Sequence, residues 1–440
     1  MNNNDPGPNR GNLAGKTILI VNSWKKAFIK KVKSLGLTVI VLDKETNGSQ
    51  PYIDYFIKSD NYNHGEAINV VDIFIKEHPE LKIDGVMTFW EDDVLLTSKL
   101  ADKFHWIGTP YKVASRIRNK YLFREFCQNN NLPVVSHKEL KSSRDLEEII
   151  KTFTFPLVVK PAFGAASSYV MKVNDEQELR DSYNYIKKQI STSVEPALHD
   201  GLEVFVEEYI DGDEVDVDIL VQNGKIKFCA ISDNSKTREP FFVETTRTTP
   251  SNLPLDDRRH LLDLADEVLE KFSITNACVH FEAKSTPKGP MPLEINLRLG
   301  GDEVYPSVKA AWKVDLIENA VKIAVGIYIP KLEPLQTPYK YLIAETFSSD
   351  HSGILVNLDV ADDLKKKDYV EEFYFEKRIG DSLLVPPDGY EYLGWILVSG
   401  NNPLDARDNL KEAIKEVNYE IGRFHPASSL GKTSRPNPFS

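Results

Sequence analysis

One stretch of this sequence places an acid, an amide and a base on the same face of a predicted strand. Residues 293–299 alternate four apolar side chains with Glu294, Asn296 and Arg298. A period of two is typical of a β-strand with two different faces, so the three polar side chains should point to the same side. A carboxylate and an amide can bind a metal ion, and an arginine can bind an anion beside it.

A second predicted strand brings another acid to this face. Residues 278–283 alternate in the same way, and residues 285–290 between the two strands are typical of a turn. The two segments should therefore form an antiparallel hairpin, and a turn centred near Lys288 would place Glu282 opposite Glu294. Two facing carboxylates repel each other unless a cation lies between them.

The atoms on this face indicate the kind of cation. Glu282, Glu294 and Asn296 offer only oxygen ligands, which suit Mg²⁺ or Mn²⁺ better than zinc. Arg298 and the two glycines after it suggest that the metal accompanies a phosphate group. The alternative is a pair of solvent-facing carboxylates on an amphipathic hairpin.

Composition excludes several classes of protein. The 440 residues carry 54 Lys and Arg against 66 Asp and Glu, a net charge of −12, which argues against nucleic-acid and anionic-membrane binding. Neither an apolar run long enough for a membrane span nor a signal peptide is present, so we expect a cytoplasmic protein. The three cysteines are widely spaced and should be reduced thiols.

The predicted elements favour a mixed fold, α/β at the N-terminus and α+β after it. Short apolar runs at 17–21, 38–42 and 85–89 alternate with helical segments, which is typical of a parallel βαβ layer. Later segments predict helix over 113–152, 304–325 and 404–421 and strand over 395–400. We predict tails at 1–13 and 426–440, an N-terminal βαβ domain at 14–112, a small lobe at 113–205, a large lobe at 206–330 and a C-terminal subdomain at 331–425.

A lysine and a loop of small residues form another candidate for phosphate binding. Lys160 ends a predicted strand at 155–160 and leads into residues 161–168, which are rich in Gly, Ala and Ser. Such a loop can direct backbone N–H groups at phosphate oxygens, although an ordinary hairpin turn explains it equally well. A strand near 204–210 then leads into an alternating acidic segment.

In their order along the chain, these pieces resemble the ATP-grasp superfamily of carboxylate–amine ligases. The resemblance covers about residues 15–425 and implies an ATP-grasp architecture, with a parallel βαβ domain, a small lid domain and an antiparallel-sheet domain. Segments 296–301, 304–325, 242–244 and 250–251 look most like the L-amino-acid ligases that make dipeptides, including the carnosine-synthase-like group, whereas residues 244–247 depart from that group's pattern. The pieces that carry the resemblance are Asn119–Lys120, the loop after Lys160, Glu207–Ile210, Glu282, Glu294, Asn296 and Arg298.

The resemblance implies a role for each of these residues. Lys120 and Lys160 would contact the phosphates of ATP beneath a lid at 164–168, and Glu207 would read the adenine edge. Arg298 and Lys160 would be catalytic. The implied ATP contacts are Lys120, Lys160, Gly164, Ala165, Ala166, Ser167, Glu207, Glu208, Ile210 and Glu214, and the implied ligands of one or two Mg²⁺ or Mn²⁺ ions are Glu282, Glu294 and Asn296.

The same resemblance implies a reaction between two small molecules, a carboxylate and an amine, with release of ADP and phosphate. Glu91 could hold a substrate ammonium group, and Arg247 could either bind the extra carboxylate of an acidic substrate or form a salt bridge. Homodimers are common among such proteins. A purine-pathway or carboxylase-type ATP-grasp enzyme and a catalytically silent nucleotide-binding scaffold are the alternatives. The implied substrate contacts are Glu91, Glu244, Arg247, Arg298, Gly300 and Gly301.

Overall fold

The computed structural model describes residues 13–332 and 337–424. The predicted tails lie outside the described residues, except for Leu13, which is 5% exposed and belongs to the hydrophobic core. The last residue of the predicted N-terminal tail is therefore packed. Among the described residues, every helix is too short or too polar to cross a membrane.

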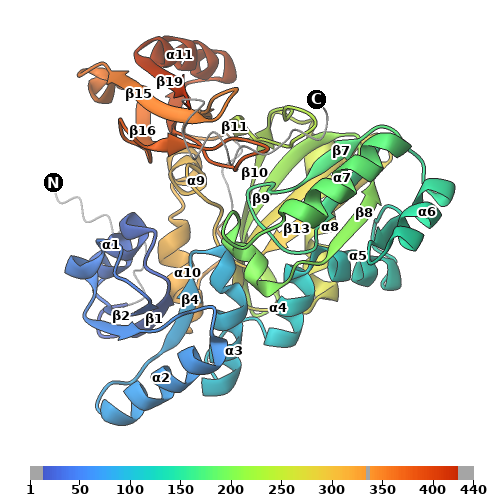
Figure 1. The fold of residues 1–440 in the computed structure, drawn as a ribbon. Coiled ribbons are helices and arrows are strands. Elements are labelled where there is room, and N and C mark those ends of the chain that lie inside the picture. Colours follow the sequence, from blue (N-terminus) through green and yellow to red (C-terminus); the bar gives the residue numbers. More distant parts are fainter. Residues whose placement is uncertain (1–12, 333–336, 425–440) are drawn as a thin grey trace.

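The N-terminal region is a parallel sheet with helices on its faces, as predicted (Figure 1). Its strand order is β3-β2-β1-β4, and every neighbouring pair is parallel. The four-residue strand β3 is missed by sequence reasoning because only one of its side chains is fully buried. The elements are β1 (Thr17–Val21), α1 (Lys26–Ser34), β2 (Thr38–Asp43), β3 (Tyr55–Lys58), α2 (His64–Glu77), β4 (Gly85–Thr88), η2 (Glu91–Asp93) and α3 (Val94–Phe104).

A small lobe follows, in which a four-stranded antiparallel sheet is covered by helices. Its strand order is β5-β8-β6-β7. The prediction of helix throughout 113–152 is wrong at 137–139, where β5 pairs with β8; three residues are too few to show a period. The elements are α4 (Tyr111–Arg118), α5 (Lys120–Asn129), β5 (His137–Glu139), α6 (Ser143–Thr152), β6 (Leu157–Pro161), β7 (Met171–Val173), α7 (Glu176–Gln189), η3 (Pro196–Asp200) and β8 (Val204–Glu208).

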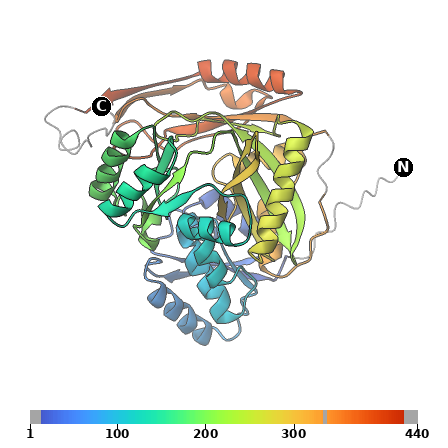
Figure 2. The same cartoon turned by 90° about the vertical axis from the view of Figure 1, so that its right-hand side faces the viewer.

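The largest layer is an eight-stranded antiparallel sheet in the order β13-β12-β9-β10-β11-β14-β18-β16. Helix α8 (Leu255–Lys271) packs buried leucines and Val268 on one face of it, in a cluster that also holds Phe123 and Cys127 of α5, whereas α6 and α7 lie to the other side in Figure 2. The strands are β9 (Asp213–Gln222), β10 (Lys225–Asn234), β11 (Thr246–Thr249), β12 (Ala277–Thr286), β13 (Gly289–Asn296), β14 (Tyr341–Phe347), β16 (Val370–Phe375) and β18 (Gly394–Gly400).

The C-terminal region adds a three-stranded sheet in the order β17-β15-β19. The helix predicted over 404–421 ends at Lys415, and the chain continues as a strand. The helix predicted over 304–325 is two helices, because Lys313 has a φ of 58° and Asp315 caps the second. The elements are α9 (Val304–Trp312), α10 (Leu316–Ala324), β15 (Gly353–Val360), β17 (Ser382–Leu383), α11 (Pro403–Lys415) and β19 (Val417–Arg423).

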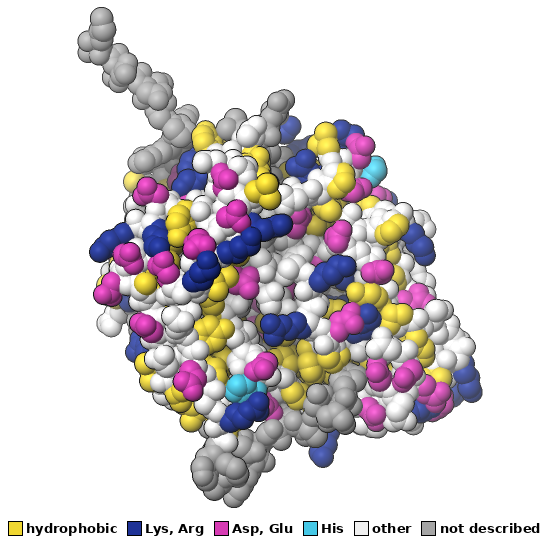
Figure 3. Space-filling model, turned by 90° about the horizontal axis from the view of Figure 1, so that it is seen from above, with side chains coloured by type: hydrophobic (Ala, Val, Ile, Leu, Met, Phe, Trp, Pro, Cys, Tyr) yellow, Lys and Arg dark blue, Asp and Glu magenta, His cyan; other side chains and the backbone are white. Residues whose placement is uncertain are grey.

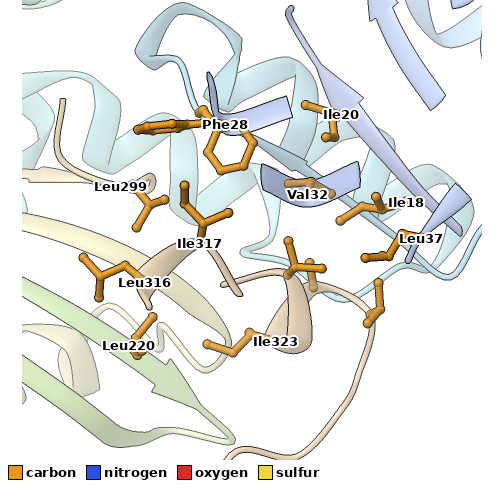
Figure 4. Close-up of a cluster of buried hydrophobic side chains, with 14 of the residues drawn as sticks. Ile18, Ile20, Phe28, Val32, Leu37, Leu220, Leu299, Leu316, Ile317 and Ile323 are labelled. Carbon is orange, nitrogen blue, oxygen red and sulfur yellow. The ribbon is translucent and has the colours of Figure 1, made fainter. Parts of the chain in front are cut away.

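A hydrophobic cluster fixes the N-terminal sheet against the large sheet (Figure 4). Ile20 and Phe28 from the N-terminal region meet Ile317 of α10, and Leu299 packs in the same cluster just after β13. The contact between β4 and α10 is so close that a Cβ on Gly85 would lie 2.2 Å from the carbonyl oxygen of Ala324. The segment after β13 is thereby held in place between the two regions.

Candidate active site

The predicted hairpin and its register are confirmed. Strands β12 and β13 pair Glu282 with Glu294 directly, and His280 with Asn296. The predicted second strand is too long, because β13 ends at Asn296 rather than continuing to 299. Beyond this point Leu299 packs into the N-terminal cluster, so the chain leaves the sheet.

The two facing carboxylates have opposite charge environments. Burial and the neighbouring Glu294 hold the pKa of Glu282 well above its usual range. Burial opposes ionisation of Glu294 too, but the charges of Lys120 and Arg118 outweigh it and lower the pKa of that carboxyl. Asn296 Nδ2 donates a hydrogen bond of 3.0 Å to Glu282 Oε1. The pair thus has one ionised carboxylate and one that lacks a compensating cation.

These side chains fit a magnesium ion by their chemistry. Among the described residues, no three His, Cys, Asp or Glu side chains gather in an arrangement that would hold a metal ion. Mg²⁺ does not need such a cluster, because it keeps several water ligands and is bound through one or two carboxylates plus substrate phosphates. The Glu282–Glu294 pair with the Asn296 amide supplies that set of oxygen donors.

The two predicted phosphate-binding lysines are both buried. Lys120 Nζ donates to the carbonyl oxygen of Gly164 at 2.9 Å and lies 3.1 Å from Glu294 Oε2. Lys160 Nζ lies 2.5 Å from Glu207 Oε1. Lys120 therefore links the small-residue loop to the metal-type carboxylates.

Glu207 is engaged in ion pairs. Its carboxylate is 3% exposed and contacts both Lys160 and Arg124, whose Nε lies 2.7 Å from Glu207 Oε2. Burial alone would raise the pKa of Glu207, but these two cations lower it to about 2. Its role as a reader of adenine stays a prediction, since both carboxylate oxygens already have cationic partners.

The small-residue loop after β6 has an unusual backbone. Gly164 has a φ of 121°, and Ala166 and Ser167 have φ values of 50° and 54°. Residues other than glycine rarely adopt a positive φ. Residues 162–170 separate the antiparallel strands β6 and β7, so the loop is longer than a two-residue turn. Ser168 Oγ at its end donates to Glu195 Oε2 at 2.8 Å.

One pocket collects most of the predicted site, with about 940 Å³ of empty space that includes its open mouth. All predicted ATP contacts except Glu208 line it, as do all three predicted metal ligands. Of the predicted substrate contacts, Glu244 and Arg298 line it. Glu91, Arg247, Gly300 and Gly301 do not.

The pocket also has lining residues that sequence reasoning missed. Val158, Tyr209 and Leu293 add apolar surface, and the Tyr209 ring lies near-parallel to that of Phe242 with 6.4 Å between centroids. An apolar wall of this kind suits a planar aromatic group. Lys284, 3.5 Å from Glu214 Oε2, adds a further cation. The alternation of apolar and charged residues in β12 was the available signal for Lys284.

Behind the pocket residue Arg298, Glu91 lies between two guanidinium groups. Arg298 Nε is 2.8 Å from Glu91 Oε2, and Arg118 Nε is 3.3 Å from Glu91 Oε1. Gly300 is tightly packed there, because a Cβ on it would lie 2.7 Å from Val304 Cγ1. This region is thus assembled from η2, α4 and the segment after β13.

Arg247 on β11 is surrounded by acids. Its guanidinium lies 2.5 Å from Asp216, 3.4 Å from Glu303 and 3.5 Å from Glu244. One positive charge is therefore shared by three carboxylates. The charge around Arg247 differs from that of the molecular surface, because Lys and Arg side chains are interspersed with Asp and Glu on the face shown in Figure 3.

Models of known protein families match three parts of the chain. An ATP-grasp N-terminal domain matches residues 29–105, an ATP-grasp domain matches residues 153–305, and an L-amino acid ligase C-terminal domain 2 matches residues 345–422. Together they span the parallel sheet, the pocket and the C-terminal region.

Two relatives share a quarter or less of their residues with this chain. Carnosine synthase 1 of Mus musculus is 25% identical over 94% of this chain and 52% of its own length, so the chain spans about half of that relative. Alanine–anticapsin ligase of Bacillus subtilis (strain 168) is 21% identical over 60% of this chain and 61% of its own.

Solved structures show the same fold. An L-amino acid ligase from Bacillus licheniformis superposes with a TM-score of 0.79 at 22% identity, covering 93% of this chain and all of that one. A phosphoribosylglycinamide synthetase from Anaerococcus prevotii gives a TM-score of 0.70 at 18% identity, covering 92% of this chain and all of that one. Two parts of the chain therefore match ATP-grasp domain models, the C-terminal region matches that of the L-amino acid ligases, and the fold is that of the solved ATP-dependent ligase structures.

Proposed function

We propose that this protein is an ATP-dependent ligase that joins the carboxylate of an amino acid to the amine of a second amino acid or similar molecule. ADP and phosphate would be the other products. The observation that carries the proposal is that Lys120, Lys160, the Glu282–Glu294 pair and Arg298 line one pocket, in which Lys120 Nζ lies 3.1 Å from Glu294 Oε2. Cations opposite metal-type carboxylates suit a nucleoside triphosphate, and the arginine suits an acyl group.

At the nucleotide end, the chain's task is to position the triphosphate and balance its charge. Lys120 and Lys160 would contact the phosphates, and the loop at 164–168 would cover them. Phosphoryl transfer needs positioning and charge stabilisation more than covalent help from the protein. Glu282, Glu294 and Asn296 would hold Mg²⁺, which neutralises charge on the phosphate oxygens when bound.

At the acyl end, Arg298 would bind the substrate carboxylate. An oxygen of that carboxylate attacks the terminal phosphorus of ATP, and the bond to ADP breaks, which gives an acyl phosphate. The amine of the second substrate then attacks the acyl carbon, phosphate leaves, and the amine loses a proton. Arg298 can stabilise the charge that develops in both steps because its guanidinium presents several donors in a fixed plane.

The surroundings of Arg247 bear on the amine substrate. Its charge is already shared by Asp216, Glu244 and Glu303. An additional substrate carboxylate would have to compete with these three acids. The geometry therefore favours the salt-bridge interpretation of Arg247 over selection of an acidic substrate.

The C-terminal region favours this proposal over the other ATP-grasp activities. Similarity in fold extends to purine-pathway synthetases and a biotin carboxylase, so the fold does not separate these activities. The match of residues 345–422 is to an L-amino acid ligase domain. A silent scaffold is disfavoured because the charged groups that ATP and metal need are all present in the pocket.

The test is phosphate release measured with Mg²⁺-ATP and a panel of amino-acid pairs. We expect release only when a suitable carboxylate and amine are both present, and loss of that release in Glu294→Ala. Lys288→Ala, in the exposed turn of the same hairpin, is the control and should retain activity. AMP as the nucleotide product, or full turnover in Glu294→Ala, would contradict the proposal.

A further inference from the structure

Arg118 is a buried cation that connects three separate parts of the molecule. It is the last residue of α4, and its side chain is 1% exposed. Its Nε lies 3.3 Å from Glu91 Oε1 of η2 and 3.5 Å from Asp200 Oδ2 of η3. Burial of a guanidinium is costly unless acidic and hydrogen-bonding partners surround it, so these contacts hold the three segments together.

The same guanidinium reaches the phosphate loop. Arg118 Nη1 donates to the carbonyl oxygen of Gly164 at 3.3 Å, and Nη2 donates to that of Ala197 at 3.2 Å. Gly164 is also the residue whose carbonyl accepts from Lys120. One side chain thus contacts the loop, η3 and the acid that pairs with Arg298.

A second contact, made by Tyr62 at the surface, joins η2 and η3. The ring of Tyr62 stacks on His199 with 4.0 Å between centroids, and its hydroxyl donates to Asp92 Oδ2 at 3.3 Å. His199 and Asp200 are neighbours in η3, and Asp92 follows Glu91 in η2. The small lobe and the N-terminal region therefore meet at both a buried and an exposed contact.

We propose that Arg118 is a positioning residue that couples the closed state of the loop at 164–168 to the placement of Glu91 and Arg298. A loop that moves away removes the Gly164 acceptor, and movement of η3 removes the Ala197 and Asp200 acceptors. Arg118 then retains Glu91 as an ion-pair partner, but Glu91, whose other oxygen pairs with Arg298, is no longer tied to the loop. Closing the loop over the nucleotide would restore the arrangement at the acyl end.

The coupling itself rests on contacts in the structure, whereas its meaning for catalysis rests on the proposed ligase function. Allosteric coupling between two sites is commonly worth about 5- to 150-fold in affinity. Arg118→Gln removes the charge but keeps a side chain of related shape. Arg118→Lys keeps the charge but cannot contact four acceptors in one plane.

The experiment is hydrogen–deuterium exchange on the full chain, with and without Mg²⁺ and the β,γ-imido analogue of ATP. In the parent protein, the analogue should slow exchange at 164–168 and also at 89–93. In Arg118→Gln, protection at 164–168 should persist, and protection at 89–93 should fall by about tenfold. Arg118→Lys should give an intermediate result, and Asp200→Asn should weaken the same response.

The matched control is Arg116→Gln. Arg116 lies on the same helix, with its guanidinium over the ring of Phe126, outside this network. It should leave exchange at 89–93 unchanged. Equal protection at 89–93 in the parent and Arg118→Gln, or equal loss in Arg116→Gln, would overturn the coupling.

Failure of the ligase proposal is separately visible. If the analogue does not bind the parent protein, the proposed function is contradicted, and the ligand-free samples still test Arg118. Without ligand, Arg118→Gln should exchange faster than the parent at both 89–93 and 196–201. Unchanged exchange at both segments would overturn the role of Arg118 whatever the protein binds.

Discussion

The two ends of the pocket are built in different ways. At the nucleotide end, Glu282 and Glu294 come from one hairpin, and the strand pair β6–β8 brings Lys160 to Glu207. At the acyl end, Glu91, Arg118 and Arg298 come from three segments more than 25 residues apart, and their contacts are ion pairs between those segments. Most groups of the first end are thus held on strands of two sheets, with Lys120 supplied by α5, and the second end depends on how the N-terminal region is placed.

We expect the nucleotide end to bind ATP and the acyl end to select the carboxylate substrate. In the proposed reaction, charges held by strand register would position the triphosphate whatever the acyl substrate is. Side chains that meet only through packing between regions, such as Glu91 and Arg298, can change with the substrate. Variants at the two ends should therefore fail in different ways.

The largest effect should come from breaking the nucleotide end. Glu294→Gln keeps the size of the side chain but removes the ionised member of the carboxylate pair and the partner of Lys120. We expect turnover to fall by about 1000-fold, since charge stabilisation is the main contribution of such groups. Weaker Mg²⁺ dependence, measured by titration in the residual activity, should accompany it. A variant with parent-like magnesium dependence would show that Glu294 does not act through the metal.

A smaller effect, roughly 100-fold, should follow Arg298→Lys at the acyl end. Lysine keeps the charge but loses the planar donors that face both Glu91 and the substrate. The KM for the carboxylate substrate should rise while the affinity for ATP stays close to that of the parent. Equal losses for both substrates would mean that the two ends are not separable.

Glu207→Gln should chiefly affect stability, by about 3 kcal/mol, because it leaves two buried cations without their shared acid. The pKa of Glu207 is lowered from an ordinary value near 4.5 to about 2, so its stabilisation is complete above pH 4.5 and is lost as pH falls towards 2. Urea unfolding between pH 4.5 and pH 2 measures how much stability is lost as the pH falls. Glu207→Gln should lose less stability over this range than the parent protein.

The control for this substitution is Glu208→Gln, the next residue on β8. The carboxylate of Glu208 accepts solvent-exposed hydrogen bonds from Ser136 and Thr154. The free energy of unfolding of Glu208→Gln should differ from that of the parent protein by less than about 0.5 kcal/mol. Similar losses in both variants would contradict a special role for the Glu207 ion pairs.

The smallest effect should distinguish two neighbouring glycines at the acyl end. A Cβ on Gly300 would lie 2.7 Å from Val304 Cγ1 and 2.9 Å from His280 Nδ1, whereas one on Gly301 would meet nothing within 4 Å. Gly300→Ala should therefore cost about 1–2 kcal/mol of stability and Gly301→Ala almost none, as measured by thermal unfolding. The reverse order would show that the packing after β13 differs from the structure.

The features predicted correctly from the sequence are those that follow from the pattern of apolar and polar residues within one short segment. The facing of Glu282 and Glu294 follows from alternation on two strands and a short turn, and it is confirmed. The N-terminal strands follow from apolar runs in the same way. Strands without such a pattern were missed, as with β3 and β5, or were read as the end of a helix, as with β19.

Contacts between distant segments could not be predicted in this way. Arg118 meets Glu91 and Asp200 because three segments pack together, and its own neighbours in the sequence carry no sign of this. The engagement of Glu207 by Arg124 likewise depends on α5 lying against β8. Identifying these residues required the geometry of the fold.

In the proposed reaction, the carboxylate bound by Arg298 is activated by transfer of a phosphoryl group. An active carboxylate substrate labelled with ¹⁸O in both carboxylate oxygens tests it directly, with the released phosphate examined by mass spectrometry. Attack of the carboxylate on phosphorus and later cleavage of the acyl phosphate carry one labelled oxygen into each phosphate released during product formation. Release of unlabelled phosphate together with ligated product would contradict the account.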